Sequence, residues 1–160
     1  MTVIDDLRLS LIAAGIVRAP NAPGAAGRPW PPPAWRHPDT GPVGPGDVAD
    51  AGGGDVSRDD GLVMTLMLAP GMPMPAGAED RERLGVDVWL RGTAVPPIIA
   101  LGQAVRRHLL GFPANPGGRT DWVMGGLYVI QSSEYKPLQP VGSEQGSYAF
   151  NAGFLFEIRA

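Results

Sequence analysis

The chain contains no cysteine, and only two histidines and one lysine occur among its 160 residues. Without cysteine the protein cannot form disulfides, thiolate zinc sites or a cysteine nucleophile. The histidines, His37 and His108, lie far apart in the sequence, and neither has a second ligand at metal-binding spacing. We expect His108 to be a surface residue near the C-terminal end of a helix, where its charge suits the helix dipole. The sequence therefore predicts no metal site and no histidine base.

Long apolar runs and strong net charge are also missing. No apolar run approaches the roughly 20 residues that span a bilayer, and Asp5 and Asp6 stand where a signal peptide would be basic. The net charge of -3 and the pI near 5.3 give no general attraction to nucleic acid or to anionic membranes. We expect a soluble, cytosolic product with no membrane contact.

Glycine and proline are abundant, with 23 and 18 residues, yet hydrophobic residues still make up 44% of the chain. This combination is typical of a compact unit with a poorly folding arm rather than of general disorder. We expect a single domain over residues 1–160, with an N-terminal helix in 1–17, an extended Pro/Gly-rich arm in 18–60 and an α+β core in 61–160.

The arm cannot form a helix or a central strand, because its prolines lack amide donors and restrict the preceding residues. Trp30 and Trp35 flank three consecutive prolines within it. Such large apolar side chains favour a binding element around residues 28–38 over a plain linker.

Hydrophobic periodicity predicts the elements of the core. Residues 62–68 form an apolar run typical of a buried strand, and residues 84–91 alternate between apolar and more polar side chains. A helix is expected to begin near Pro96 and to end at Gly111. Two further strands are expected near residues 121–131 and 147–158, and their aromatic side chains favour pairing with each other.

These elements predict an α+β fold with a mainly antiparallel four-stranded sheet, two helices packed on one face and a long Pro/Gly-rich arm. Leu138 to Gly146 is expected to be a polar link between the last two strands. A parallel crossover through the 84–91 strand, its helix and the 121–131 strand is also compatible with the pattern, and the sequence leaves the strand order open.

Motifs for catalysis or cofactor binding are missing. The carboxylate pairs at 59–60 and 79–80 lack the spacing of a calcium loop. The glycine-rich stretches at 52–54 and 117–118 lack the features of a phosphate loop, and no Gly-x-Ser-x-Gly elbow occurs. We expect no catalytic residues, no cofactor and no enzymatic activity.

Contact residues are the remaining candidates. Asp87, Trp89 and Arg91 point to one side of a strand, where they form either an exposed ion pair or a subunit contact. Met72 and Met74 lie in a proline-rich loop, which is either a plain flexible hairpin loop or an adaptable apolar contact for a partner. The polar side of the last strand adds two charged residues. The candidate subunit interface comprises Trp30, Trp35, Met72, Met74, Asp87, Trp89, Arg91, Glu157 and Arg159.

Several segments, taken in order, resemble tail terminator proteins of long-tailed actinobacterial bacteriophages, also described as minor capsid or head-to-tail connector proteins. The resemblance covers nearly the whole chain. The segments are Asp6-Leu-Arg-Leu-Ser-Leu-Ile-Ala-Ala-Gly, the Pro-rich stretch with Trp35, Val86-Asp-Val-Trp-Leu-Arg, Met124-Gly-Gly-Leu-Tyr-Val-Ile-Gln-Ser, Leu138-Gln-Pro-Val-Gly-Ser, Gln145-Gly-Ser-Tyr-Ala-Phe and Leu155-Phe-Glu.

This resemblance implies a virion structural protein of the tail or neck, assembled in the host cytoplasm. It implies a homo-hexameric ring that caps the tail tube, joins it to the head-tail connector or stopper protein, and lets DNA pass through its lumen without specific binding. It implies no catalysis and no cofactor. The alternatives are another neck protein, such as a head-tail adaptor or stopper, and a tail tube subunit. Outside this class, an immunity or binding module and a small hydrolase are competing hypotheses.

Overall fold

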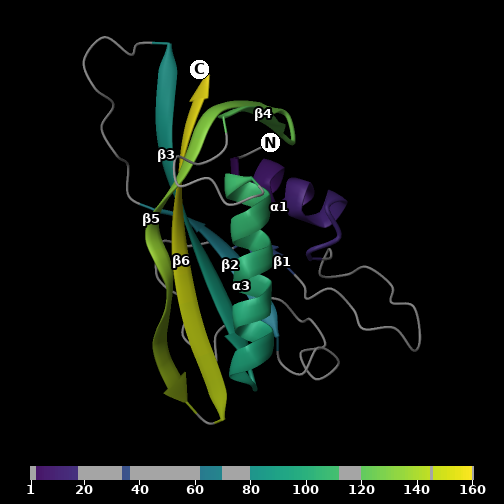
Figure 1. The fold of residues 1–160 in the computed structure, drawn as a ribbon, viewed down its shortest axis with the longest axis vertical. Coiled ribbons are helices and arrows are strands. Elements are labelled where there is room, and N and C mark those ends of the chain that lie inside the picture. The colour runs from purple at the N-terminus through teal and green to yellow at the C-terminus, as the bar shows by residue number, and fades with distance from the viewer. Residues whose placement is uncertain are drawn as a thin grey trace.

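A computed structural model of the chain describes residues 3–17, 34–36, 62–69, 80–111, 120–144 and 146–159. These residues build two helices and one mixed sheet with the strand order β1-β2-β3-β6-β5-β4 (Figure 1). The elements are α1 (Val3–Ala13), β1 (Ala34–Arg36), β2 (Val63–Leu68), β3 (Arg81–Gly92), α3 (Val95–Leu110), β4 (Thr120–Met124), β5 (Leu127–Glu144) and β6 (Ser147–Arg159).

Five of the six strands are joined by antiparallel pairing, while the short β1 runs parallel to β2 at one edge. Strand β6 pairs with β3 on one side and with β5 on the other. Strands β3 and β5 therefore run in the same direction with β6 inserted between them. The two strands of the crossover that the sequence allowed are thus parallel, but they are not neighbours in the sheet.

The α+β class is confirmed, and the count of four strands is wrong. The segment expected as one strand near 121–131 is a hairpin, because β4 ends at Met124 and β5 begins opposite it at Leu127. Gly125 has φ 61, which glycine adopts readily and other residues rarely do. Two glycines between strand-forming segments are a known hairpin signal, and the single-strand prediction overlooked it.

The polar link expected at Leu138 to Gly146 is also mostly strand. Strand β5 continues to Glu144, where it faces Ser147 across a two-residue turn. Pro137 and Pro140 are tolerated because β5 has four register shifts relative to β6, and prolines are admitted at bulges and on edge strands. The hairpin of β5 and β6 is consequently the longest feature of the molecule (Figure 1).

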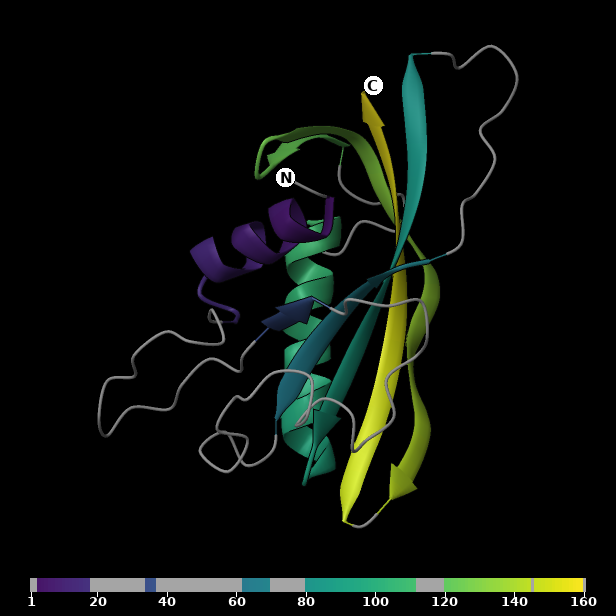
Figure 2. The ribbon, with the colours of Figure 1, turned by 180° about the vertical axis from the view of Figure 1, so that it is seen from behind.

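Both helices cover the same face of the sheet, as expected (Figures 1 and 2). Helix α1 confirms the predicted N-terminal helix and buries Leu7 and Leu11 completely. Helix α3 ends at Leu110 with Gly111 as its C-cap, and the predicted apolar stripe lies in the core. The stripe consists of Ile98, Leu101, Val105 and Leu109. Alternate side chains of β3 and β6 pack against this stripe from the sheet side. The largest of them are Phe154 and Phe156.

Most of the arm predicted at 18–60 and the methionine-rich loop lie outside the described residues. Within the arm, only the backbone of β1 is described, and it adds a strand at the edge of the sheet rather than in its centre. In the described part of the chain, no helix is long and apolar enough to cross a membrane.

Candidate subunit interface

The sheet face opposite the helices carries the predicted interface residues that the structure describes. Side chains alternate along a strand, so the buried Val86, Val88 and Leu90 of β3 direct their neighbours to the helix-free face. Five predicted residues lie on this face, namely Asp87, Trp89 and Arg91 of β3 with Glu157 and Arg159 of β6. Trp30, Met72 and Met74 lie outside the described residues, and of Trp35 only the backbone in β1 is described.

Asp87 takes part in a contact between strands, and its described partners are Tyr135 and Lys136 rather than Arg91, the partner in the ion-pair alternative. Asp87 is 8% exposed, and its carboxylate accepts a hydrogen bond from the Tyr135 hydroxyl and lies 3.3 Å from the Lys136 ammonium. Burial, followed by the bond to Asp87, raises the pKa of Tyr135. Because the carboxylate is already paired across the sheet, Asp87 is poorly placed to bind a partner protein.

A bulge in β5 creates this contact. Glu134 faces Phe154 and Lys136 faces Gly153, so Tyr135 is an extra residue on the β5 side of the ladder. A bulge of this kind lets two consecutive side chains reach the same face of a sheet. The Tyr135 ring lies directly over Gly153, where even a methyl group would collide with it. No pattern of residues in the sequence predicts this bulge.

Trp89 and Arg91 are partly buried on the same face. The indole Nε1 of Trp89 and the Nε of Arg91 are shielded from solvent and have no hydrogen-bond partner among the described residues. Burial also lowers the pKa of the Arg91 guanidinium. Each side chain would have to turn outward before its buried nitrogen could reach a partner protein. The aromatic and apolar parts of these side chains are therefore better placed to contact a partner. Their interface role stays a prediction.

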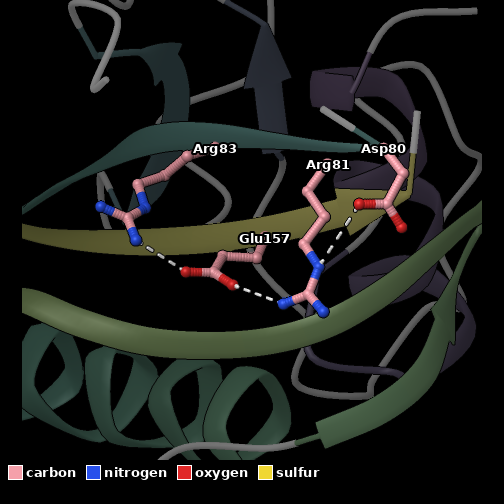
Figure 3. Close-up of polar contacts among 4 residues, drawn as sticks. All are labelled: Asp80, Arg81, Arg83 and Glu157. Atoms are coloured by element: carbon pink, nitrogen blue, oxygen red, sulfur yellow. Dashed lines mark hydrogen bonds and ion pairs between the residues drawn. The ribbon is translucent and has the colours of Figure 1, made fainter. Parts of the chain in front are cut away.

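Glu157 is the centre of a charged network at the opposite end of the helix-free face (Figure 3). Its Oε1 accepts a hydrogen bond of 2.8 Å from Arg83 Nη2, and its Oε2 lies 3.9 Å from Arg81 Nη1. Arg81 also lies 3.8 Å from the exposed Asp80. Such partly exposed ion pairs contribute about 0–1 kcal/mol each, so this network orients β3 against β6 without stabilising it strongly.

Arg159 lies beside Tyr128, with its guanidinium carbon 5.1 Å from the ring centroid, within the range of a cation–π contact. The Tyr128 hydroxyl donates a 2.7 Å hydrogen bond to Asp121, which raises the pKa of this tyrosine. Asp121 has φ 52, a left-handed conformation that aspartate tolerates better than most residues. Tyr128 lies directly opposite Val123 across the β4–β5 hairpin, and Val123 is 63% exposed.

The structure also joins the N-terminal helix to the β4–β5 turn, a contact that the sequence did not predict. Asp6 is 4% exposed and accepts a 2.9 Å hydrogen bond from the Gly126 amide. A Cβ atom on Gly125 would lie 2.5 Å from the Asp6 carboxylate. The residues of two segments that carry the family resemblance therefore touch each other.

His108 bonds to Ser10, with 2.8 Å between Nε2 and Oγ, and its ring meets the edge of Trp122 at a centroid distance of 6.1 Å. It lies at the end of α3 as expected, but it is partly buried against α1 rather than exposed. A serine nucleophile needs a base, an orienting group and oxyanion donors together. We assign the Ser10–His108 bond to the docking of α1 on α3. Among the described residues, no cluster of three potential metal ligands occurs.

No protein-family model and no curated protein matches this chain. A solved structure described as the virion of a native gene transfer agent particle is similar to it, with 12% sequence identity and a TM-score of 0.43. The similarity covers 61% of this chain and 69% of that chain. At this level of similarity no conclusion about function follows.

Proposed function

We propose that this protein is a structural protein of a bacteriophage virion, and specifically a ring subunit of the tail terminator. In this role it caps the tail tube, joins it to the head connector and catalyses no reaction. The proposal is supported by the resemblance of seven segments, in order, along nearly the whole chain. It does not depend on any single motif, because apolar strands and glycine turns are common in unrelated proteins.

The geometry is compatible with a function exerted through surfaces. In the described residues the polar side chains mainly connect elements of the protein to one another, as Asp6, Asp87 and Glu157 do. Large apolar side chains are instead exposed at both ends of the sheet, including Val123 at 63% and Val141 at 45%. The observation that carries the proposal is this division, because exposed apolar side chains are suited to contacts between proteins.

The state of association tests the proposal directly. We expect the purified protein to form a closed ring, with a mass several times the 16.8 kDa of one chain, in light scattering and electron micrographs. Added to tubes of the tail tube protein from the same virion, the ring should bind at their ends and stop their growth. Open filaments would instead identify a tube subunit, and a monomer at high concentration would contradict a ring protein of any kind.

The arm is tested separately. Removal of residues 18–60 deletes β1, which leaves β2 as the edge of the sheet, so the core should keep its circular dichroism spectrum. If the arm contributes to assembly, this variant should form rings more weakly than the full chain. Equal assembly by both proteins would remove the arm from the mechanism.

A further inference from the structure

Arg91 differs from Arg83 and Arg159, which lie with it on the helix-free face of the sheet. Arg83 donates a 2.8 Å hydrogen bond to Glu157, as Figure 3 shows. The guanidinium carbon of Arg159 lies 5.1 Å from the centroid of the Tyr128 ring. Within the described residues, the Arg91 guanidinium has no ion pair, hydrogen bond or ring contact. It is therefore a cation to which the described structure gives no countercharge.

Arg91 is also partly buried, which makes the missing countercharge costly. Burial lowers the pKa of its guanidinium, and its Nε is shielded from solvent. The two Nη atoms are not among the shielded nitrogens, so they are the atoms that an incoming group can reach. Because water solvates this cation incompletely, a carboxylate should bind it more strongly than it would bind a fully exposed arginine.

A row of polar side chains lies next to Arg91. Thr65, Trp89 and Asn151 are direct neighbours across β2, β3 and β6. Trp89 is two positions from Arg91 on the same strand, so the row shares its face of the sheet. Thr65 and Asn151 are 3% and 4% exposed. In the described part of the chain, nothing bonds to Thr65 Oγ1, Trp89 Nε1 or Asn151 Oδ1.

This row offers both a donor and an acceptor. The indole N–H of Trp89 can only donate a hydrogen bond, and the amide oxygen of Asn151 can only accept one. A peptide backbone has the matching C=O and N–H groups. A buried polar group without a hydrogen bond destabilises the protein, so a partner that supplies both groups gains from the pairing.

The residues beside Arg91 on the neighbouring strands are small. Arg91 lies opposite Ala149 of β6, and Ala149 lies opposite Gly142 of β5. A Cβ atom on Gly142 would meet nothing within 4 Å. Both helices lie on the other face of the sheet (Figures 1 and 2). None of these described elements blocks a partner that approaches Arg91 from the helix-free side.

We propose that this part of the helix-free face binds an acidic segment of another protein. A carboxylate of the segment accepts hydrogen bonds from the Nη atoms of Arg91. When Trp89 and Asn151 turn outward, the backbone of the segment accepts a hydrogen bond from the indole and donates one to the amide oxygen. A phosphate group fits less well, because a phosphate dianion has no donor for Asn151. The inference goes beyond the proposed ring function, since it specifies the chemistry of a partner and does not require a ring.

A pair of small probes tests the contact. N-acetyl-glutamate methylamide has one carboxylate and two peptide groups, and N-acetyl-glutamine methylamide has the same shape without the charge. The protein is labelled with 5-fluorotryptophan, and the signal of Trp89, one of four tryptophans, is assigned by its loss in Trp89→Phe. We expect the glutamate probe to shift this signal saturably and the glutamine probe to bind at least about tenfold more weakly, because it lacks the charged acceptor.

Arg91→Met removes the cation and should bind the glutamate probe no better than the glutamine probe. Arg83→Met is the matched control, because Arg83 lies on the same strand and face but is already paired with Glu157. It should bind the glutamate probe like the wild-type protein. A shift that does not saturate, equal binding of the two probes, unchanged binding by Arg91→Met or lost binding by Arg83→Met would overturn the contact.

The comparison of the two probes on the wild-type protein decides the question even if Arg91→Met fails to fold. Inorganic phosphate is a third probe, and binding tighter than that of the glutamate probe would identify a phosphate site and overturn the acidic segment. These outcomes are independent of assembly. A ring that does not bind the glutamate probe would overturn this contact alone, and a monomer that binds it would overturn the ring alone.

Discussion

The two ends of the sheet differ in how their residues are used. At the end that carries α1 and the β4–β5 hairpin, polar side chains tie elements together, as in the Asp6–Gly126 and Ser10–His108 bonds. At the β5–β6 tip, exposed apolar side chains such as Val141 and Tyr148 surround a tight turn. The first end depends on specific internal contacts, so most of its substitutions should affect folding. Substitutions at the tip should affect folding less.

Two glycines with positive φ provide the largest expected difference between the ends. Gly125 has φ 61 and Gly146 has φ 78, but a Cβ atom would lie 2.5 Å from Asp6 at Gly125 and meets nothing within 4 Å at Gly146. Gly125→Ala should lower the free energy of unfolding by about 2–5 kcal/mol, the sum of backbone strain and overpacking. Gly146→Ala should cost only the strain, about 1–2 kcal/mol. Urea denaturation measures both, and equal losses would refute the difference between the ends.

The bond between Asp6 and the Gly126 amide is the next most sensitive contact. Asp6→Ala leaves this partly buried amide without its acceptor and should destabilise the protein by about 1–3 kcal/mol. Asp6→Asn keeps an oxygen acceptor in the same place and should recover part of that loss. Amide hydrogen exchange at Gly126 should accelerate in the alanine variant, and an unchanged rate would show that the contact does not hold the turn.

Tyr135, in the middle of the sheet, should make the free energy of unfolding depend on pH. Its pKa is raised above the ordinary value of 10.0, so the folded state keeps the proton that the unfolded state loses first. Stability from this group is therefore fully present below about pH 10 and is lost as pH rises toward its folded pKa. Tyr135→Phe should cost about 1 kcal/mol at pH 8 and should show a smaller loss of thermal stability between pH 9 and pH 11. Parallel pH profiles of the two proteins would contradict this.

The charged network around Glu157 should give the smallest effect. Arg83→Met removes the 2.8 Å contact, but both side chains are partly exposed. The expected loss is at most about 1 kcal/mol, and it should shrink at 1 M salt, where charges are screened over a few ångströms. Glu82→Met, which removes an exposed charge from the same strand, is the control. A loss above 2 kcal/mol at Arg83 would show that this end is held by charge rather than by packing.

The sequence predicted the regular elements well, because their hydrophobic periods are local. The alternation in β3, the apolar stripe of α3 from Ile98 to Leu109, and the phenylalanines of β6 all reach the core as expected. It failed where a single local feature changes the path of the chain. The Gly125–Gly126 turn splits one expected strand into two, and Tyr135 forms a bulge that no residue pattern announces.

The candidate interface was predicted less well than the fold. The sequence correctly placed Asp87, Trp89 and Arg91 on one side of a strand. It could not show that Tyr135 and Lys136 donate hydrogen bonds to the Asp87 carboxylate. It also did not single out Tyr148, Val141 or Val123 as exposed. Whether an apolar side chain of a strand is covered depends on where the neighbouring helix ends, and that is a property of the assembled fold.

By itself, the sequence determined the class of the fold, the helices, the apolar faces of the strands and the family resemblance, since each is encoded in residues close together in the chain. Only the tertiary structure decided the strand order, the contact between Asp6 and the Gly126 amide, and which apolar side chains are exposed at the two ends. These features join residues up to 120 positions apart. Their energies come from packing and desolvation between distant segments, which local patterns do not specify.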